Sequence, residues 1–272
     1  MNRSLIKDLT KPVEGAFPVY FIAGLAGHVL HYRPLARLLA ERWLLRGILY
    51  PVYAGGSPRT ASLEDLADQM RAALDDPQDP VVLAGYSVGG TIAYEIAVAL
   101  RRQGRRAGVV MIDSQPRALR RKLRKRRLPM VRRAIRLGRK VVQGWQGLMG
   151  RQAHRDPDAP PEVKWTPEDP QVRIFQIESR EAVRAYVPPG SDVPVVILKA
   201  VPPRVPLWMA RVYWPGADNG WRFVAPVAAV LPVSATHHTI MEGENQLALA
   251  SALAEGCGII HDALARETRS GP

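Results

Sequence analysis

The sequence contains a single cysteine, Cys257, among its 272 residues. One thiol excludes an internal disulfide and every metal site that needs several thiolates, such as an iron–sulfur centre. No uninterrupted apolar run reaches the roughly 18 residues of a membrane span, because Gly or Pro breaks the longest candidates. The N-terminal residues 1–8 also lack the apolar stretch of a signal peptide. We therefore expect a soluble protein of the reducing cytoplasm, with no metal site.

Acidic residues are missing from residues 117–140, which carry 13 Lys or Arg. The whole chain has 38 basic and 25 acidic residues, so this segment alone accounts for the net charge of +13. A basic run is most often a solvated helix face, but it also fits a surface that binds anionic membrane or nucleic acid. The segment has no aromatic residue before Trp145, which argues against nucleic acid.

The rest of the composition, 47% hydrophobic and 23% charged, is typical of a globular protein. Short apolar runs alternate with helical patterns through the first 112 residues. We expect strands at residues 18–23, 47–52, 81–84 and 107–112. We expect a first helix that opens at Pro34 and carries apolar residues up to Trp43, a second capped by Ser62, and a third over residues 91–100. This alternation predicts an α/β fold, with a parallel sheet and helices on both faces.

The alternation stops at Asp113 and resumes near residue 193. The later part predicts strands at residues 193–199 and 227–233 and helices at residues 172–186 and 246–264. We therefore predict one domain over residues 1–272. Its core would comprise residues 16–114 and 191–265, and an insertion would occupy about residues 115–190.

The clearest chemical signal is the run Gly85-Tyr86-Ser87-Val88-Gly89. It has the G-x-S-x-G form, and it stands between a buried strand and an apolar helix, the context of a nucleophile elbow. In that turn the serine hydroxyl is exposed at the end of the sheet. With ten serines and 22 glycines in the chain, well under one such match is expected by chance. We therefore predict that Ser87 is a catalytic nucleophile.

A serine nucleophile needs a base, and the base needs a carboxylate to orient it. The adjacent pair His237 and His238 follows the last expected strand, and the order serine, aspartate, histidine is that of α/β-hydrolases. Asp113 directly follows the fourth strand, but Asp192 and Asp218 are alternatives for the acid. His154 and His261 are interpreted as solvated surface residues, and His28 and His31 lie near the first loop.

An oxyanion formed during acyl transfer needs backbone N–H donors. The residue after the nucleophile, Val88, supplies one, and the loop after the first strand supplies the other. Residues 24–27, Gly-Leu-Ala-Gly, occupy that loop, where glycines allow close approach of the backbone.

Four motifs together resemble one known family. The loop and helix Phe21–Ala36 and the elbow Gly85–Ala97 are similar to thioesterase domains of nonribosomal peptide and polyketide synthases. An aspartate 26 residues after the serine and the run His237–Glu242 also match that family. The resemblance implies an α/β-hydrolase fold with a helical lid at residues 115–190. It also implies a triad of Ser87, Asp113 and His237, with Leu25 as the second oxyanion donor beside Val88.

The same resemblance implies a thioesterase that releases an acyl, peptidyl or polyketide chain from a carrier protein, by hydrolysis or cyclisation. The substrate would arrive on the carrier's phosphopantetheine arm, with no cofactor bound to the enzyme itself. An acidic carrier would dock on the basic segment, for which Arg124, Lys125, Arg126 and Arg127 are candidates. The alternatives are an esterase or lipase on free or membrane-derived esters, a freestanding editing thioesterase, and a non-catalytic binding module.

Overall fold

The structure is a computed structural model that describes residues 5–25, 27–57, 59–74, 79–116, 169–201 and 218–267. In this part of the chain seven strands form one sheet in the order β1-β3-β2-β4-β5-β6-β7. The edge strand β1 is antiparallel to β3, and all other neighbours are parallel. The strands are β1 (Ile6–Asp8), β2 (Phe17–Ile22), β3 (Trp43–Ile48), β4 (Val81–Tyr86), β5 (Ala107–Ile112), β6 (Val195–Val201) and β7 (Val227–Ser234).

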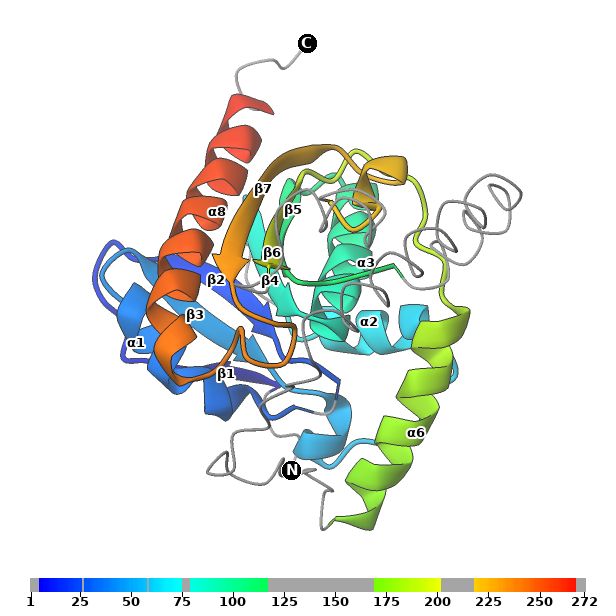
Figure 1. The fold of residues 1–272 in the computed structure, drawn as a ribbon. Helices are drawn as coiled ribbons and strands as arrows, with labels where there is room; N and C mark the ends of the chain where they lie inside the picture. The colour runs from blue at the N-terminus through cyan, green and yellow to red at the C-terminus, as the bar shows by residue number, and fades with distance from the viewer. Residues whose placement is uncertain are drawn as a thin grey trace, which may run out of the picture.

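Helices cover both faces of the sheet (Figure 1). The α-helices are α1 (Arg33–Leu39), α2 (Leu63–Arg71), α3 (Val88–Arg102), α6 (Pro170–Ala185) and α8 (Gln246–Glu267). On one face α8 packs against α1 and β4 to β7, and on the other α3 packs against β2, β4 and β5, with α2 behind it. The predicted fold class, a mostly parallel sheet flanked by helices, is confirmed.

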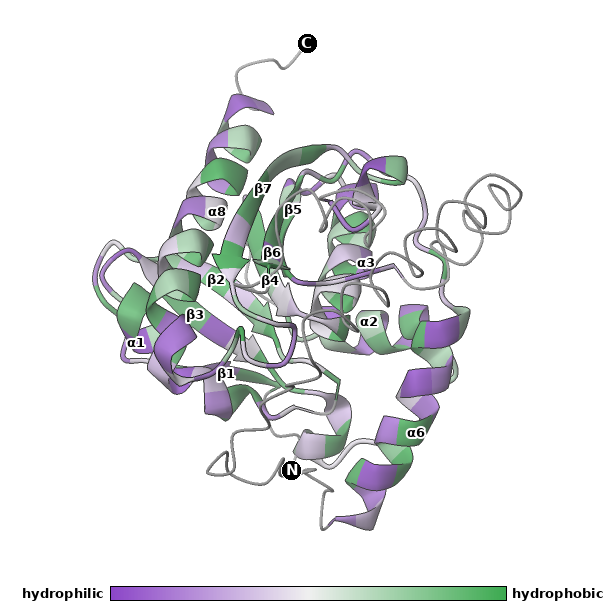
Figure 2. Cartoon of the chain, viewed as in Figure 1, coloured by the Kyte–Doolittle hydropathy of each residue, from purple (hydrophilic) through white to green (hydrophobic). Residues whose placement is uncertain are grey.

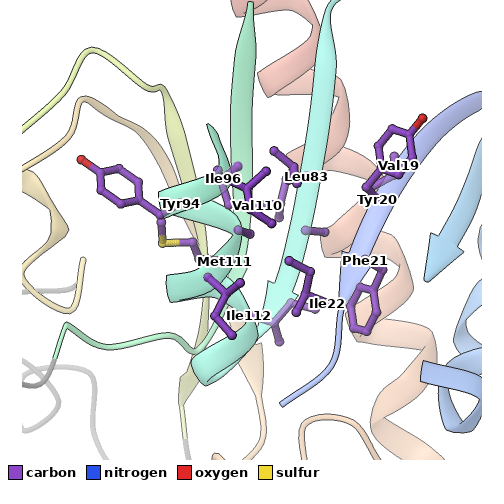
Figure 3. Packing of buried hydrophobic residues seen from close by; sticks show 14 of the residues in the cluster. Val19, Tyr20, Phe21, Ile22, Leu83, Tyr94, Ile96, Val110, Met111 and Ile112 are labelled. Atoms are coloured by element: carbon purple, nitrogen blue, oxygen red, sulfur yellow. The ribbon is translucent and has the colours of Figure 1, made fainter. Parts of the chain in front are cut away.

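The core lies between the sheet and the two helical layers. The central strands β4 and β5 are buried almost throughout, because helices cover them from both sides. Their sequences are therefore continuous apolar runs, and Figure 2 shows them as hydrophobic. Ile22 of β2, Leu83 of β4, Ile96 of α3 and Val110 of β5 are among the buried side chains drawn in Figure 3. Val110 faces α8, where a Cβ on Gly256 would lie 3.1 Å from it.

Two sequence predictions near the second strand were wrong. The first helix ends at Leu39, and Trp43 begins β3 instead of continuing the helix. The strand therefore spans Trp43–Ile48 and not residues 47–52, because Pro51 opens a 3-10 helix, η2 (Pro51–Ala54). The predicted cap of α2 is confirmed, since the Ser62 hydroxyl accepts a hydrogen bond from the Asp65 amide at 3.0 Å.

By length and mean hydropathy, one helix among the described residues is apolar enough to span a membrane, namely Gly243–Glu267. The expectation of no such segment rested on uninterrupted runs, which Gly256 and Gly258 break. In the structure this segment includes α8, whose buried residues Leu249, Leu253 and Ile260 belong to the core of the fold. We therefore assign α8 to the helical layer that covers the sheet.

Most of the predicted insertion lies outside the described residues, but α6 and the chain that follows it are described. The Tyr186 hydroxyl donates a buried hydrogen bond to the Glu95 carboxylate on α3. Burial raises the pKa of Glu95, and this hydrogen bond acts in the opposite direction. The Tyr94 hydroxyl lies 2.7 Å from the Pro189 carbonyl oxygen. The C-terminal end of α6 is thus fastened to α3. The predicted domain boundaries stay a prediction.

The junction of β4 and α3 is packed backbone to backbone. A Cβ on Gly89 would lie 2.3 Å from the Ile22 carbonyl oxygen, and a Cβ on Gly85 would lie 2.3 Å from the Gly89 carbonyl carbon. Both distances are shorter than any Cβ contact in a folded protein, so only glycine at these two positions lets the backbones of α3, β2 and β4 approach so closely. The first turn of α3 therefore rests directly on β2 and β4.

We expect Gly89→Ala to lower the free energy of unfolding by about 1–3 kcal/mol, because α3 must move away from β2. The matched control is Gly258→Ala on α8, where a new Cβ meets nothing within 4 Å. That change should raise the free energy of unfolding by up to about 1 kcal/mol, since alanine is the better helix former. Denaturant unfolding of both variants checks this, and a Gly89→Ala protein as stable as the wild type would contradict it.

Candidate active site

Ser87 occupies a strained turn between β4 and α3. Its φ of 54° and ψ of −117° lie in a region that non-glycine residues rarely adopt. Two hydrogen bonds hold the turn, because the Ser87 amide donates to the Ile112 carbonyl at 2.9 Å and the Ser114 hydroxyl donates to the Ser87 carbonyl at 2.6 Å. The backbone is thereby fixed, and the Ser87 side chain stands at the carboxyl end of the parallel strands.

His237 lies in the turn after β7, opposite Ser87. Its Nε2 atom is 3.1 Å from the Ser87 Oγ, which is hydrogen-bond distance. The ring stacks on Tyr86 with centroids 5.3 Å apart, and the Tyr86 hydroxyl donates to the His237 carbonyl at 2.6 Å. Burial raises the pKa of Tyr86 well above its usual value, so the hydroxyl remains a donor. Tyr86 therefore holds both the ring and the backbone of His237.

Asp113 follows β5 and completes a line of three side chains. Its Oδ2 atom is 2.8 Å from the Nδ1 of His237, and its amide donates to the Leu198 carbonyl at 2.8 Å. Burial alone would raise the pKa of this carboxyl group. The hydrogen bond with His237 and the positive charge of Lys199 outweigh burial and hold the pKa below its usual value. Asp113 is thus an anion at neutral pH, and it can orient the imidazole.

The alternative acids have other partners. Asp218 is paired with Arg222 at 2.6 Å and accepts a hydrogen bond from the Gly220 amide. Asp192 is paired with Arg101 at 2.8 Å. Of the three aspartates, only Asp113 is hydrogen-bonded to His237.

The other described histidines do not bond to Ser87. His238 contacts the His237 ring edge-on. His28 lies against Tyr53, and His261 lies against Phe17. His154 lies outside the described residues.

A cavity of about 230 Å³ opens beside these side chains. Its lining includes Val183 of α6, so α6 forms part of its wall. Val88 begins α3, so its amide is among those that find no partner within the helix. The lining residues are Ser87, Val88, Thr91, Asp113, Gln115, Val183 and His237.

Leu25, the other predicted oxyanion donor, lies in the loop after β2 and is half-buried. That loop packs against the elbow, since a Cβ on Gly24 would lie 2.9 Å from the Tyr86 ring. Leu25 does not line the cavity. Arg124, Lys125, Arg126 and Arg127 lie outside the described residues. Among the described residues no cluster of three metal-ligating side chains occurs.

Sequence reasoning missed a polar layer behind Asp113. Lys199 of β6 lies 3.6 Å from the Asp113 Oδ1, and its ammonium donates a hydrogen bond to the Asn219 side chain. Asn219 and Trp221 each donate to the Ser114 carbonyl, at 3.0 and 3.1 Å. The one local signal is the lysine that follows the apolar run Val195–Leu198, and by itself it indicates only the end of a strand.

Comparison with known proteins shows which family the chain is similar to. Residues 17–136 match the family model described as the thioesterase domain. The predicted family resemblance is confirmed. Over 107 residues the chain is 33% identical to enterobactin synthase component F of Escherichia coli K12, covering 38% of this chain and 8% of that synthase. Over 102 residues it is 30% identical to the chondramide synthase of Chondromyces crocatus, and the match covers 36% of this chain and 2% of that synthase.

Solved thioesterase domains share the fold along nearly the whole chain. The NocB thioesterase domain from the nocardicin cluster has a TM-score of 0.61 at 22% identity and covers 93% of this chain and 99% of that one. The Vlm2 thioesterase domain bound with a dodecadepsipeptide has a TM-score of 0.63 at 20% identity. That match covers 93% of this chain and 99% of the Vlm2 chain. The chain thus spans a small fraction of the curated synthases but the full length of the solved thioesterase domains.

We expect Tyr86→Phe to slow the reaction of Ser87 with a fluorophosphonate several-fold, because His237 loses a backbone anchor. The free energy of unfolding should fall by about 1 kcal/mol, the usual contribution of one hydrogen bond. The matched control is Tyr53→Phe in η2, whose ring contacts His28 instead. Labelling rates and denaturant unfolding check this, and equal rates for Tyr86→Phe and wild type would contradict it.

Proposed function

We propose that this chain is a thioesterase that releases an acyl or peptidyl chain from a carrier protein through an acyl-serine intermediate. The observation that carries the proposal is the line from Ser87 through His237 to Asp113, with spacings of 3.1 and 2.8 Å. This line occurs in a chain that matches the thioesterase family model. The cytoplasm is the proposed location.

In the proposed reaction the Ser87 Oγ attacks the thioester carbonyl carbon while the His237 Nε2 takes the hydroxyl proton. Asp113 accepts the Nδ1 hydrogen bond, which fixes the tautomer with a free Nε2 and stabilises the imidazolium that forms. The tetrahedral intermediate collapses, the carbon–sulfur bond breaks, and His237 returns the proton to the departing thiolate. Water, or a nucleophile on the acyl chain, then attacks the acyl-serine carbonyl carbon while His237 takes its proton. The bond between that carbon and the Ser87 Oγ breaks, His237 returns the proton to Oγ, and an acid or a ring is released.

The developing oxyanion needs donors that are already in place. We assign this role to the amide of Val88, which begins α3 beside Ser87, and to the amide of Leu25 in the neighbouring loop. The substrate would be held on the phosphopantetheine arm of its carrier, and this chemistry requires no cofactor bound to the thioesterase.

An esterase that acts on free or membrane-derived oxygen esters is the alternative. The same three side chains would serve that reaction, so the geometry of the site does not separate the two. The family match favours the thioester. Turnover of acyl-pantetheine thioesters against matched oxygen esters distinguishes them, and a clear preference for the oxygen ester would overturn the proposal.

We expect Ser87→Ala to lose both thioester turnover and covalent labelling by a fluorophosphonate. Asp113→Asn should lower turnover by about 10³–10⁴, because the imidazole adopts the wrong tautomer. Asp192→Asn is the matched control and should keep wild-type turnover, since that carboxylate is paired with Arg101 at the surface. Steady-state kinetics and mass spectrometry of the labelled protein check these outcomes. Persistent labelling in Ser87→Ala would overturn the nucleophile assignment.

We further propose that the basic segment 117–140 attracts an acidic carrier. Such attraction is screened over about 8 Å at physiological salt. We expect added salt to weaken apparent affinity for an acyl-carrier substrate steeply and to leave a small acyl-pantetheine substrate nearly unchanged. Replacing Arg124, Lys125, Arg126 and Arg127 with Gln should have the same selective effect, mainly through slower association.

Kinetics with both substrates at increasing ionic strength check this prediction. Equal losses on carrier and small substrate would mean that the segment shapes the pocket. No loss on either would mean that it is a solvated surface.

A further inference from the structure

Lys199 is a buried charge that the proposed reaction does not use. It stands near the end of β6, after the fully buried run Val195–Leu198, and it is itself only 6% exposed. Burying an ammonium group is costly unless the charge is paired and hydrogen-bonded. The partners of Lys199 therefore indicate why the cation is kept there.

The Lys199 ammonium is held in place from two sides. Asn219 accepts its hydrogen bond through Oδ1, and the Asn219 amide group donates to the Ser114 carbonyl at 3.0 Å. Asn219 has a φ of 55°, a left-handed conformation that asparagine tolerates better than most residues. On the other side, the Asp113 Oδ1 lies 3.6 Å from the ammonium nitrogen.

The two oxygens of Asp113 thus have different surroundings. Oδ2 is bonded to the Nδ1 of His237. Oδ1 is buried and faces the positive charge of Lys199. The backbone amide of Ala200, the next residue of β6, also lowers the pKa of this carboxyl group. The cation therefore attracts one oxygen of the carboxylate and leaves the other directed at the imidazole.

We propose that Lys199 is a positioning residue that holds the Asp113 carboxylate against His237 and sets the pH at which Ser87 becomes reactive. This inference rests on the proposed function. Lys199 acts through Asp113 and touches none of the reacting atoms. Its charge keeps Asp113 ionised, and it opposes the arrival of a second positive charge on the neighbouring imidazole.

The titratable groups around Asp113 and the His237 ring are Tyr86 of β4, Lys199 of β6 and His238, whose ring contacts that of His237 edge-on. Tyr86 remains neutral because burial raises its pKa. Lys199 and Asp113 therefore supply opposite fixed charges behind the imidazole. Removing the cation leaves the Asp113 anion uncompensated, and this change in charge should move the pH range in which Ser87 reacts.

The test is the rate at which a fluorophosphonate labels Ser87, measured from pH 5 to pH 9. In the neutral variants Lys199→Met and Lys199→Gln we expect the midpoint of the rate–pH profile to move upward by about 0.5–1 unit. Lys199→Arg, which keeps the charge, should restore the wild-type midpoint. The matched control is Lys7→Met on strand β1, which lies at the edge of the sheet far from β6. This change removes a cation there and should not move the midpoint.

The outcomes separate a positioning role of Lys199 from a role in stability alone. An unchanged midpoint in a folded neutral variant would overturn the positioning role of Lys199. If both neutral variants fail to fold while Lys199→Arg folds, the charge serves stability alone, and the proposal is also overturned. Wild-type protein that is not labelled at Ser87 would instead overturn the proposed function and this inference with it. The two failures are therefore distinguishable in one experiment.

Discussion

The contact between the first turn of α3 and the backbone of β2 and β4 is the constraint on which the site depends. Gly85 and Gly89 allow that contact because neither position has room for a Cβ. Since the helix begins directly where β4 ends, the residue between them must adopt a positive φ, and Ser87 does. The hydroxyl is then presented at the edge where β5 and β7 also end. Asp113 and His237 reach it from there without any long loop having to fold inward.

Charge order is the second organising feature of this edge. A cation, an anion, an imidazole ring and a hydroxyl follow one another from Lys199 to Ser87, each within a short contact of the next. Burial strengthens interactions among such groups because the surroundings screen them less than water does. The alternation avoids placing like charges side by side in a region where repulsion would be costly. It also explains how an apolar sheet accommodates two ionised side chains at its carboxyl end.

The sequence predicted those features that depend on neighbouring residues. The elbow around Ser87, the cap at Ser62 and the buried run of β5 are local patterns, and the structure places all three as expected. Asp113 and His237 were predictable as strand-end residues, but the choice among aspartates needed the family resemblance. Lys199 and Asn219 were not predictable, because their roles depend on contacts between segments far apart in sequence. Trp43 was assigned to a helix because its spacing after Leu39 fits a helix as well as a new strand.

The hydrogen bond between Tyr186 and Glu95 bears on how the segment at residues 115–190 can be exchanged between related domains. Tyr186 follows α6, whereas Glu95 belongs to α3, so an exchange that takes in Tyr186 separates a buried donor from its acceptor. Glu95 would then be left as a buried carboxyl group without its donor, a destabilising arrangement. A chimera made by cutting before Tyr186 keeps the pair intact. A chimera that is cut after Tyr186 must also take the residue at position 95 from the donor domain. The natural unit of exchange is therefore discontinuous in sequence.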